Sequence, residues 1–349
     1  MFRYISLIGF FVIFYSVTSA QSRVSIENLV FEGAGIRGIA YCGALSEMEE
    51  RGLNKGIKRV AGTSAGAIMA MAVSVGYTSH ELADIISNTN FKDFNDGKYF
   101  FAGGINRTNK YFGWYRSKQF DSWLGKLIEQ KTGNADITFA ELHHRGFTDL
   151  FITGTCLNKQ RLIVFSYETY PSMRVRDAVR ISMSIPVYFE AVFITPEGKI
   201  INHPKDKQNL DVMVDGGFTG NFPIRIFDST RYIAPSERNS FAFNQKTVAF
   251  RIDKEAQVKN DSTNRQLAEI DVNNFKSYLG AFYNMVVENL NRQSLTENDW
   301  ERSVSISDAA IGPKLRKLSK TEVQELIANG RNAMHLYLQN NSNDTAAND

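Results

Sequence analysis

Near the start of the chain, short apolar runs alternate with glycine-rich turns and with apolar residues at helical spacing. The run from Leu29 to Phe31 predicts a strand, and apolar positions recurring from Ile39 to Met48 predict a helix after the turn "EGAGIRG". A second cycle follows, with a strand from Lys58 to Ala61, a turn at Ser64 and a helix from about Ala65 to Val75. Two such units in succession predict an α/β fold with a parallel sheet and helices packed on its faces.

The remainder of the chain adds further strands and helices. The segments "DLFITGTCLN" and "RLIVFSYE" predict two strands joined as a hairpin, and "DVMVDGG" and "TVAFRID" predict two more strands. One helix is expected in "VRDAVRISMSIP", which Pro186 ends, and another from Val272 to Leu295. A last helix is expected from Ser319 to about Leu338, because Glu322 completes a capping box with Ser319.

The first residues of the chain differ from the rest. Arg3, an apolar run from about Ile5 to Val17 and small residues up to Ala20 are typical of a secretory signal peptide. The run is shorter than the roughly 20 apolar residues of a spanning helix, so we expect cleavage after Ala20, with an uncleaved anchor as the alternative. The protein is therefore expected to be exported, to the periplasm or the exterior.

The sequence contains no internal repeat and no linker that would divide it, so one domain is expected. The last residues are mainly Asn, Ser, Asp and Ala, which predicts disorder. The expected divisions are a signal peptide at 1–20, a single domain at 21–338 and a disordered tail at 339–349.

Composition narrows the possible functions. The chain of 349 residues is 43% hydrophobic and 22% charged, as in ordinary globular proteins. A net charge of +3 is too small to indicate a nucleic-acid partner. Cys42 and Cys156 are the only cysteines, which favours two buried apolar side chains over a disulfide framework. No Cys and His spacing is typical of a zinc site, so no metal is expected.

The glycines from Gly33 to Gly38 match GxGxxG between a strand and a helix, which is also the fingerprint of a dinucleotide site. That interpretation requires an Asp or Glu at the end of the next strand, to hold the ribose. Here the next strand ends in Gly62, Thr63 and Ser64. No cofactor is therefore expected.

The stretch "VAGTSAGAIMA" predicts a nucleophile elbow, in which a serine lies on a sharp turn between a strand and a helix. Side chains at Gly62 or Gly66 would collide with neighbouring backbone, and Thr63 and Ala65 complete the turn around Ser64. The first amides of the helix would lie beside the serine oxygen. A tight turn that only packs closely is the alternative.

A serine nucleophile needs a base, and the sequence offers a histidine or a carboxylate. His335 would fit the order of an α/β-hydrolase triad, but it lies within the last predicted helix. Asp215, in "VMVDGGFTGNFP", lies at the end of a strand. Because the ordinary pKa of Asp is near ~3.9, it serves only against the hydroxyl in a site that excludes water. Taken alone, the segment of Asp215, Gly216 and Gly217 is better interpreted as a turn.

Three motifs in this order, "EGAGIRG", "GTSAG" and "DGGFTGNFP", resemble the signature elements of patatin-like phospholipases. The segment "DAVRISMSIP" resembles the helix before the aspartate of that family, and the similarity extends from about Asn28 to Leu338. The resemblance implies a three-layer α/β sandwich, with Ser64 as the nucleophile and Asp215 as the sole base. It also implies an oxyanion loop of backbone amides formed by Gly33, Ala34, Gly35, Ile36, Arg37 and Gly38.

Arg37, Glu32 and Ser184 lie in or near these motifs. Arg37 matches the basic residue of the family's loop, where it would bind a phosphate head group or support the loop; a charge that caps nearby carbonyls is the alternative. The family often has Asp in place of Glu32 and Ala in place of Ser184. Neither position is expected to take part in chemistry, so these departures concern the shape of the loop and pocket.

The resemblance implies a phospholipid or lysophospholipid substrate and a peripheral contact with membranes. Nine aromatic residues lie between Phe91 and Tyr115 beside several basic ones, as at a membrane interface. Rings packed into the core are the alternative. A Ser-His-Asp esterase and a lipid-binding protein without turnover remain the other functional hypotheses.

Overall fold

The computed structural model describes residues 25–97, 100–237, 243–263, 265–275, 277–278, 281, 285, 291–292, 294–312 and 316–347. The segment predicted to be a signal peptide lies outside these residues. The helix expected from Val272 to Leu295 lies largely outside them as well.

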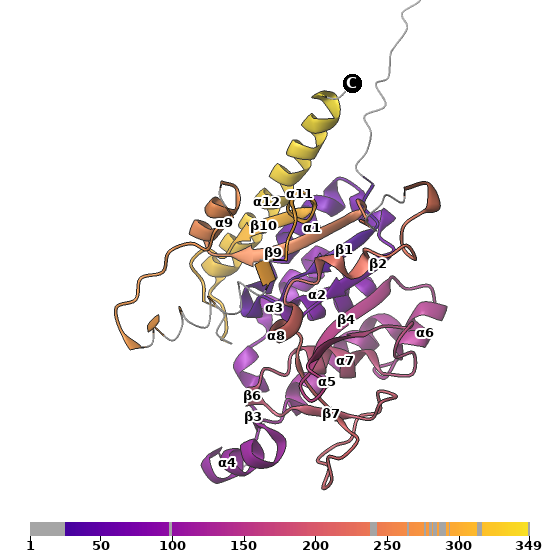
Figure 1. Cartoon of the computed structure of the whole chain (residues 1–349), viewed down its shortest axis with the longest axis vertical. Coiled ribbons are helices and arrows are strands. Elements are labelled where there is room, and N and C mark those ends of the chain that lie inside the picture. The colour runs from indigo at the N-terminus through magenta and orange to yellow at the C-terminus, as the bar shows by residue number, and fades with distance from the viewer. Residues whose placement is uncertain are drawn as a thin grey trace, which may run out of the picture.

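The predicted parallel sheet is present at the centre of the molecule (Figure 1). Its strands follow the order β10-β9-β1-β2-β4-β8-β7, and β5 pairs with β4 off this path. Neighbours from β10 to β4 are parallel, while β8, β7 and β5 run antiparallel to their partners. The strands are β1 Asn28–Phe31, β2 Arg59–Gly62, β4 Asp149–Cys156, β5 Arg161–Phe165, β7 Val192–Ile194, β8 Asp211–Asp215, β9 Thr247–Asp253 and β10 Ser303–Ser307. A second, two-stranded sheet pairs β3 Gly113–Tyr115 with β6 Val187–Phe189.

Helices cover both faces of the central sheet. The α-helices are α1 Ala40–Glu50, α2 Ala65–Ser74, α3 Ser79–Asn88, α4 Phe100–Tyr111, α5 Lys118–Thr132, α6 Phe139–His144, α7 Val175–Ser182, α8 Gly217–Gly220, α9 Glu255–Asp261, α11 Glu297–Glu301 and α12 Lys320–Ala347. The short 3-10 helices are η1 Gly35–Ile39, η2 Leu53–Gly56, η3 Phe91–Phe94, η4 Ile224–Phe227 and η5 Pro235–Glu237. The α/β three-layer prediction is confirmed.

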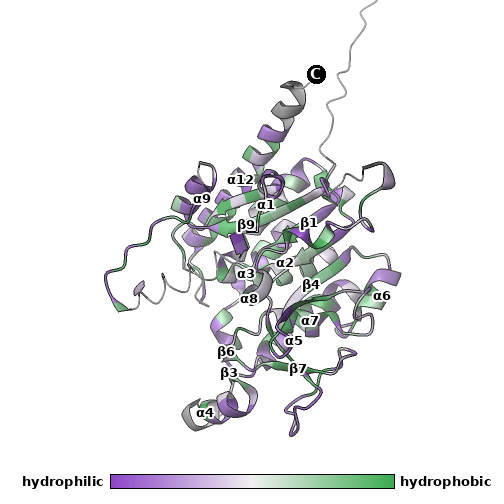
Figure 2. Ribbon diagram, in the orientation of Figure 1, coloured by the Kyte–Doolittle hydropathy of each residue, from purple (hydrophilic) through white to green (hydrophobic). Residues whose placement is uncertain are grey.

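Alternation along the central strands sends side chains to two different cores. In β1, Leu29 and Phe31 join the larger core with α1 and α2, and Val30 joins a smaller core on the opposite face. The smaller core is covered by the segment around η4, with Phe222 and Phe227. Figure 2 shows the hydrophobic residues gathered on the central strands. Both faces are therefore buried, as expected for the parallel part of the sheet.

The helix at the end of the chain is longer than the sequence predicts. It continues from Lys320 to Ala347 and extends away from the sheet (Figure 1). It therefore covers most of the segment for which composition predicts a disordered tail. No Gly or Pro follows Leu338, so nothing in the sequence stops the helix there, although Asn and Ser favour it only weakly.

The aromatic-rich segment before β3 is divided between the core and the surface. Phe91 and Phe94 in η3 are buried, and their ring centroids lie 6.3 and 5.4 Å from that of Trp123. Farther along, Ile105 in α4 is 55% exposed and Phe112 is 43% exposed. The first part thus covers the core, and the later part presents apolar side chains to solvent.

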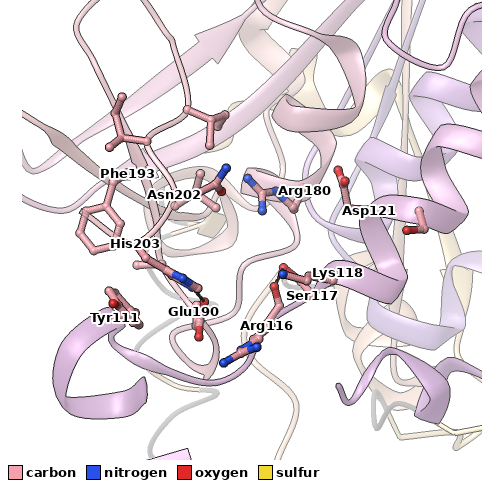
Figure 3. A pocket seen from close by; sticks show the side chains of 15 residues that line it. Tyr111, Arg116, Ser117, Lys118, Asp121, Arg180, Glu190, Phe193, Asn202 and His203 are labelled. Carbon is pink, nitrogen blue, oxygen red and sulfur yellow. Dashed lines mark hydrogen bonds and ion pairs between the residues drawn. The ribbon is translucent and has the colours of Figure 1, made fainter. Parts of the chain in front are cut away.

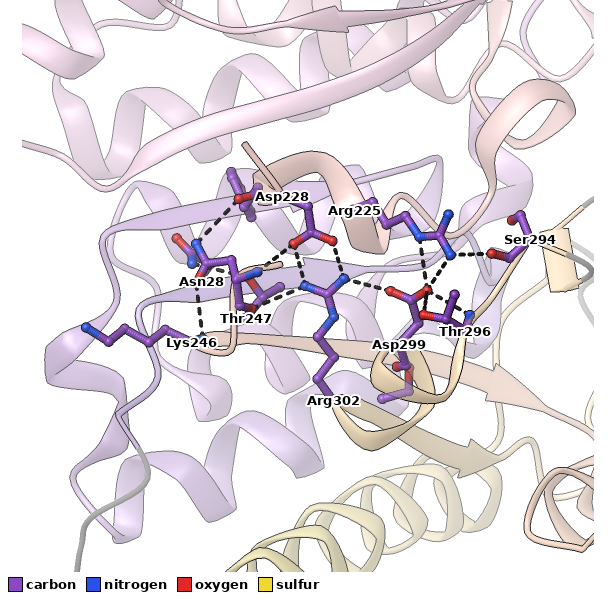
Figure 4. A network of polar contacts seen from close by, with 12 residues as sticks. Asn28, Arg225, Asp228, Lys246, Thr247, Ser294, Thr296, Asp299 and Arg302 are labelled. Atoms are coloured by element: carbon purple, nitrogen blue, oxygen red, sulfur yellow. Dashed lines mark hydrogen bonds and ion pairs between the residues drawn. The ribbon is translucent and has the colours of Figure 1, made fainter. Parts of the chain in front are cut away.

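A buried network of arginines and carboxylates joins the η4 segment to β10 (Figure 4). Arg302, just before β10, donates to Asp299 and to Asp228 at 2.7 Å each. Arg302 binds Asp299 Oδ1, whereas Arg225 donates to Asp299 Oδ2 at 3.0 and 2.6 Å, and the backbone amide of Thr296 donates to Oδ2 at 2.9 Å. Asp299 is only 1% exposed. This network fixes the cover of the smaller core in place.

Candidate active site

Ser64 occupies the sharp turn between β2 and α2. Its backbone has φ 53° and ψ −122°, a conformation that L-residues adopt only under constraint. A Cβ at Gly62 would lie 2.1 Å from the carbonyl oxygen of Gly66, and one at Gly66 would lie 2.2 Å from that of Phe31. Glycine is therefore required on both sides, and strand and helix approach closely enough to hold the turn.

The register of the sheet brings Asp215 to Ser64. Strand β4 pairs with β2 and with β8, so that Ile152 lies opposite Gly62 and Gly154 lies opposite Asp215. These two positions are separated by one pleat of β4, about 7 Å. The turn after β2 carries the hydroxyl across this interval, and Ser64 Oγ donates to Asp215 Oδ2 at 2.7 Å.

The Asp215 carboxylate is buried and has no cationic partner among the described residues. Its other oxygen accepts a hydrogen bond from the Gly217 amide at 2.8 Å, and its own amide donates to the Ser184 carbonyl at 2.9 Å. Burial raises the pKa of Asp215 to about 6, although the bonds from Gly217 and Ser64 favour the charged form. The group is therefore a stronger base than an ordinary aspartate and still ionised at neutral pH.

The glycine loop lies directly against Ser64. A Cβ at Gly33 would lie 3.1 Å from Ser64 Cβ, and Gly35 opens η1 with φ 57°. Ala34 is buried at the start of η1, and Ile36 and Gly38 are buried within it. The first amides of a helix have no acceptor within that helix, so the start of η1 offers donors beside Ser64 Oγ.

Two residues hold this loop: Asn221, which the sequence did not single out, and Glu32, whose departure from the family was expected to concern the shape of the loop. The side-chain amide of Asn221, at the end of α8, donates to the Gly33 carbonyl at 3.0 Å. The backbone carbonyl of Asn221 accepts from the Gly33 amide at 3.1 Å. Glu32 accepts from the Ile252 amide at 3.2 Å and from Asn221 at 3.3 Å. The quoted motif "DGGFTGNFP" contains Asn221, but only the folded chain brings it to the loop.

The end of α7 forms another wall of the site. The Ser64 amide donates to Ser182 Oγ at 2.8 Å, and Met183 Sδ lies 3.5 Å from Ser64 Oγ. Apart from their place in "DAVRISMSIP", neither residue carries a sequence signal that points to the site. Thr63 turns away and bonds Thr153 Oγ1 at 2.6 Å, which anchors the elbow to β4.

Arg37 supports the loop through contacts within the protein. Its Nε donates to the Ala34 carbonyl at 3.0 Å, and its Nη1 lies 3.2 Å from Asp308 Oδ2. These contacts fit both a support for the loop and a charge that caps a nearby carbonyl.

Histidines have other partners in the part of the chain that the structure describes. His335 Nδ1 lies 2.9 Å from Glu47 Oε1, so this ring joins α12 to α1. His80, His143 and His203 contact Asp84, Asp149 and Glu190 respectively. The Ser64 hydroxyl, in contrast, contacts Asp215 and Met183.

An apolar pocket begins at the glycine loop and the elbow. It is lined by Gly35, Ile36, Gly38, Ile39, Ala65, Ile68, Met69, Ile86, Phe91, Trp123 and Met183. Its lining thus combines the loop, the first turns of α2 and the methionine that contacts Ser64. Such a surface can accept a hydrocarbon group attached to an ester carbonyl at Ser64.

Neither a metal centre nor a membrane span is found within the described ranges. These residues contain no group of three or more His, Cys, Asp and Glu side chains placed to hold a metal ion. None of their helices combines the length and apolarity needed to cross a bilayer. Cys42 and Cys156 are both free and buried, so the favoured interpretation of the cysteines is confirmed.

Comparison with known proteins identifies the family. Residues 29–228, more than half of the chain, match the model of the Patatin family, described as patatin-like phospholipase. The chain therefore belongs to the patatin-like phospholipase family, whose members are generally lipid hydrolases. The resemblance found in the three sequence motifs is confirmed.

Several relatives share the same region. Uncharacterized protein YqhO of Bacillus subtilis is 32% identical over 226 residues, covering 60% of this chain and 72% of that protein. An uncharacterized protein of Acanthamoeba polyphaga mimivirus is 31% identical over 208 residues, 59% of this chain and 63% of its own. A probable lipid hydrolase of Invertebrate iridescent virus 6 is 27% identical over 201 residues, 57% of this chain and 62% of its own. This chain spans less than two thirds of the two viral relatives.

The fold has a counterpart among solved structures. The crystal structure of VipD from Legionella pneumophila superimposes with a TM-score of 0.53, covering 90% of this chain and 67% of that chain. The two sequences are 14% identical, so the similarity concerns the fold alone.

Proposed function

We propose that the protein is a lipid acyl hydrolase of phospholipase A or lysophospholipase type, which cleaves carboxylic ester bonds of glycerophospholipids. The observation that supports this most strongly is the 2.7 Å contact between Ser64 Oγ and Asp215 Oδ2 beside the glycine loop. Membership of the patatin-like family and a relative named as a probable lipid hydrolase support a lipid ester as substrate.

Acylation begins when Ser64 Oγ attacks the ester carbonyl and Asp215 Oδ2 takes the hydroxyl proton. The Gly217 amide holds the other carboxylate oxygen, so the base is oriented before the substrate arrives. Amides at Gly35 and Ile36 donate to the oxyanion as charge develops, a contribution of about 10²–10³ in rate per donor. The alcohol then leaves with the proton from Asp215, and the acyl group stays on Ser64.

Deacylation repeats these steps with water. The water oxygen attacks the acyl carbon while Asp215 takes one of its protons, and the same amides stabilise the second oxyanion. The fatty acid leaves as Ser64 Oγ recovers the proton from Asp215. The cycle thus uses one hydroxyl, one carboxylate and backbone amides, and requires no cofactor or metal.

The apolar pocket, about 30 Å³ in volume, would hold the part of the acyl chain next to the ester carbonyl, and Met183 lies beside it, 3.5 Å from Ser64 Oγ. Exposed apolar side chains at Ile105 and Phe112 would meet a lipid surface, because rings and aliphatic side chains enter the head-group region readily. The protein would then act as a peripheral membrane protein.

The test is the product pattern from a mixed lipid extract, measured by mass spectrometry. The wild type and the Ser46→Ala variant should release fatty acids, whereas Ser64→Ala should release none. Ser46 is a matched control because its hydroxyl contacts Glu50 on α1. A fluorophosphonate probe should label Ser64, with the modified peptide identified by the same method.

Other outcomes would favour the remaining hypotheses. Release of fatty acid that disappears in His335→Ala would indicate a Ser-His-Asp esterase. Lipid binding with neither probe labelling nor product release would indicate a member of the fold that has lost turnover.

We also propose that the chain is exported through an N-terminal signal peptide. This rests on the order of Arg3, the apolar run and the small residues before Ala20. Mass spectrometry of the mature N-terminus should find Gln21 as the first residue. A mature chain that retains the apolar run would indicate the membrane anchor instead.

A further inference from the structure

A second cavity, lined mainly by polar groups, lies between α5, α7 and the segment that follows β6 (Figure 3). Its volume is about 370 Å³, within the range of small-molecule sites. Its lining shares no residue with the apolar pocket at Ser64. The two cavities are therefore separate features of the surface.

Three basic side chains line this cavity without a carboxylate partner in the described part of the chain. They are Arg116 and Lys118 at the start of α5, and Arg180 in α7, whose guanidinium lies between Asn202 and Asp121 in Figure 3. The buried Nε atoms of Arg116 and Arg180 have no hydrogen-bond partner. Buried donors of this kind are normally satisfied, so an ordered water or a bound ligand is expected to accept from them.

The acidic groups nearby are engaged elsewhere or face the cavity with a free oxygen. Asp121 lies 3.6 Å from Arg176, and Glu190 contacts His203 at 3.0 Å and lies 3.9 Å from Arg107. Asp121 Oδ1 is buried, and so is Glu190 Oε1, the oxygen that lies 3.9 Å from Arg107 Nε. Neither oxygen accepts a hydrogen bond from the described residues. The cavity therefore offers unused acceptors as well as unused donors.

The start of α5 is not itself the binding feature. Asp96 already accepts hydrogen bonds from the amides of Arg116, Lys118 and Gln119, at 3.0, 2.8 and 3.2 Å. Its carboxylate thus caps the helix through the backbone and leaves the Arg116 and Lys118 side chains free to bind a ligand.

We propose that this cavity binds a phosphorylated polyol, either as a soluble phosphate ester or as the head group of a lipid. Phosphate oxygens match the forked donors of Arg116 and Arg180 and the ammonium of Lys118. Hydroxyl groups on the same ligand match the free oxygens of Asp121 and Glu190. Neither inorganic phosphate nor a plain polyol satisfies both sets of groups.

The proposal does not depend on hydrolysis at Ser64, because the site has its own lining and its ligand need carry no ester. Isothermal titration with glycerol 3-phosphate, inorganic phosphate and glycerol tests it directly on the full chain. Glycerol 3-phosphate should bind most tightly, inorganic phosphate about tenfold more weakly, and glycerol not measurably.

The matched variants are Lys118→Gln in the cavity and Lys126→Gln on an exposed turn of the same helix. Loss of one charge-assisted hydrogen bond should weaken glycerol 3-phosphate binding about tenfold in Lys118→Gln and leave it unchanged in Lys126→Gln. Arg180→Gln should weaken it at least as much. The ligand should also raise the thermal midpoint of the wild type and fail to raise that of Arg180→Gln.

Vesicles distinguish the two sources of the ligand. Retention on phosphatidylcholine vesicles that depends on added phosphatidylglycerol and on Lys118 assigns the lipid head group. Binding of glycerol 3-phosphate without such retention assigns the soluble ester. The proposal would be overturned if neither glycerol 3-phosphate binding nor vesicle retention were found, or if Lys118→Gln and Lys126→Gln bound glycerol 3-phosphate equally. Tighter binding of malonate, an anion without phosphate or hydroxyl groups, than of glycerol 3-phosphate would also overturn it.

Discussion

Two buried aspartates, Asp215 and Asp299, show how the same side chain is used in opposite ways. Asp299 is bound by Arg225 and Arg302 and by the Thr296 amide, and these contacts hold its pKa well below the usual range despite burial. Among the described residues, Asp215 has only a hydroxyl and an amide as hydrogen-bond donors to its carboxylate, and burial raises its pKa to about 6.

The comparison separates a structural carboxylate from one available for chemistry. A carboxylate surrounded by cations is too stable as an anion to take a proton from a hydroxyl. A carboxylate that is buried without cations can still take up a proton. Its desolvation makes the folded state less stable. Each side of this contrast leads to a measurable expectation.

The largest expected effect is on hydrolysis when the unpaired carboxylate is neutralised. Asp215→Asn keeps the shape of the side chain but cannot accept the Ser64 proton, so kcat should fall by at least about 10³-fold. Far-ultraviolet circular dichroism should show an unchanged fold. Turnover of a soluble ester within tenfold of the wild type would contradict the assignment of Asp215 as the base.

Removal of the paired carboxylate should instead affect stability. Asp299→Ala leaves Arg302 buried with Asp228 as its one carboxylate partner among the described residues, and the free energy of unfolding should fall by about 3–5 kcal/mol. Denaturant titration measures the change, with Glu301→Gln, an exposed residue of α11, as the matched control. An equal effect of both variants would mean that the network has no special role.

Neutralising Asp215 should make the protein more stable at neutral pH. Its pKa is about 6 in the folded state against an ordinary 3.8, so the folded protein holds the extra proton between these values. Stability therefore falls as pH rises through this window, by at most about 3 kcal/mol. Asp215→Asn should abolish this part of the pH dependence in denaturant titrations and gain about 1–3 kcal/mol at pH 7. A less stable Asp215→Asn variant at pH 7 would contradict this expectation.

The smallest effect concerns the pH profile of activity. The base works only when ionised, so kcat/KM should fall about tenfold per pH unit below about pH 6 and level off above it. Initial rates on a soluble ester, at pH values where the fold is intact, measure this profile. A midpoint of the kcat/KM profile near the ordinary pKa of aspartate would mean that water reaches Asp215 in the free enzyme.

The sequence predicts the parts of the site that have a local signature. The elbow at Ser64 needs glycines at fixed offsets, and Asp215 ends a recognisable strand, so both can be found without coordinates. Asn221 and Ser182 could not be assigned a role, because their contacts with Gly33 and Ser64 join segments 188 and 118 positions apart. A single polar residue gives no sign of its role in the sequence, because its partner is known only once the chain is folded.

The same reasoning explains how far the fold could be predicted. Strands and helices with clear periodicity were found, including the hairpin of β4 and β5 and the short helix α7. The extension of α12 to Ala347 was missed, because composition alone does not distinguish a weak helix former from a helix end. The Asp299 network was missed, because charged residues in sequence give no sign of burial.

The pairing of both catalytic candidates with β4 limits how this protein can vary. Sliding β8 by one residue along β4 would turn the Asp215 side chain to the opposite face of the sheet, out of reach of Ser64. Loops between the strands can lengthen at little entropic cost, because closure entropy grows slowly with length. Insertions should therefore accumulate in the connections. Strand β4, which sets the distance between the hydroxyl and the carboxylate, should keep its number of residues.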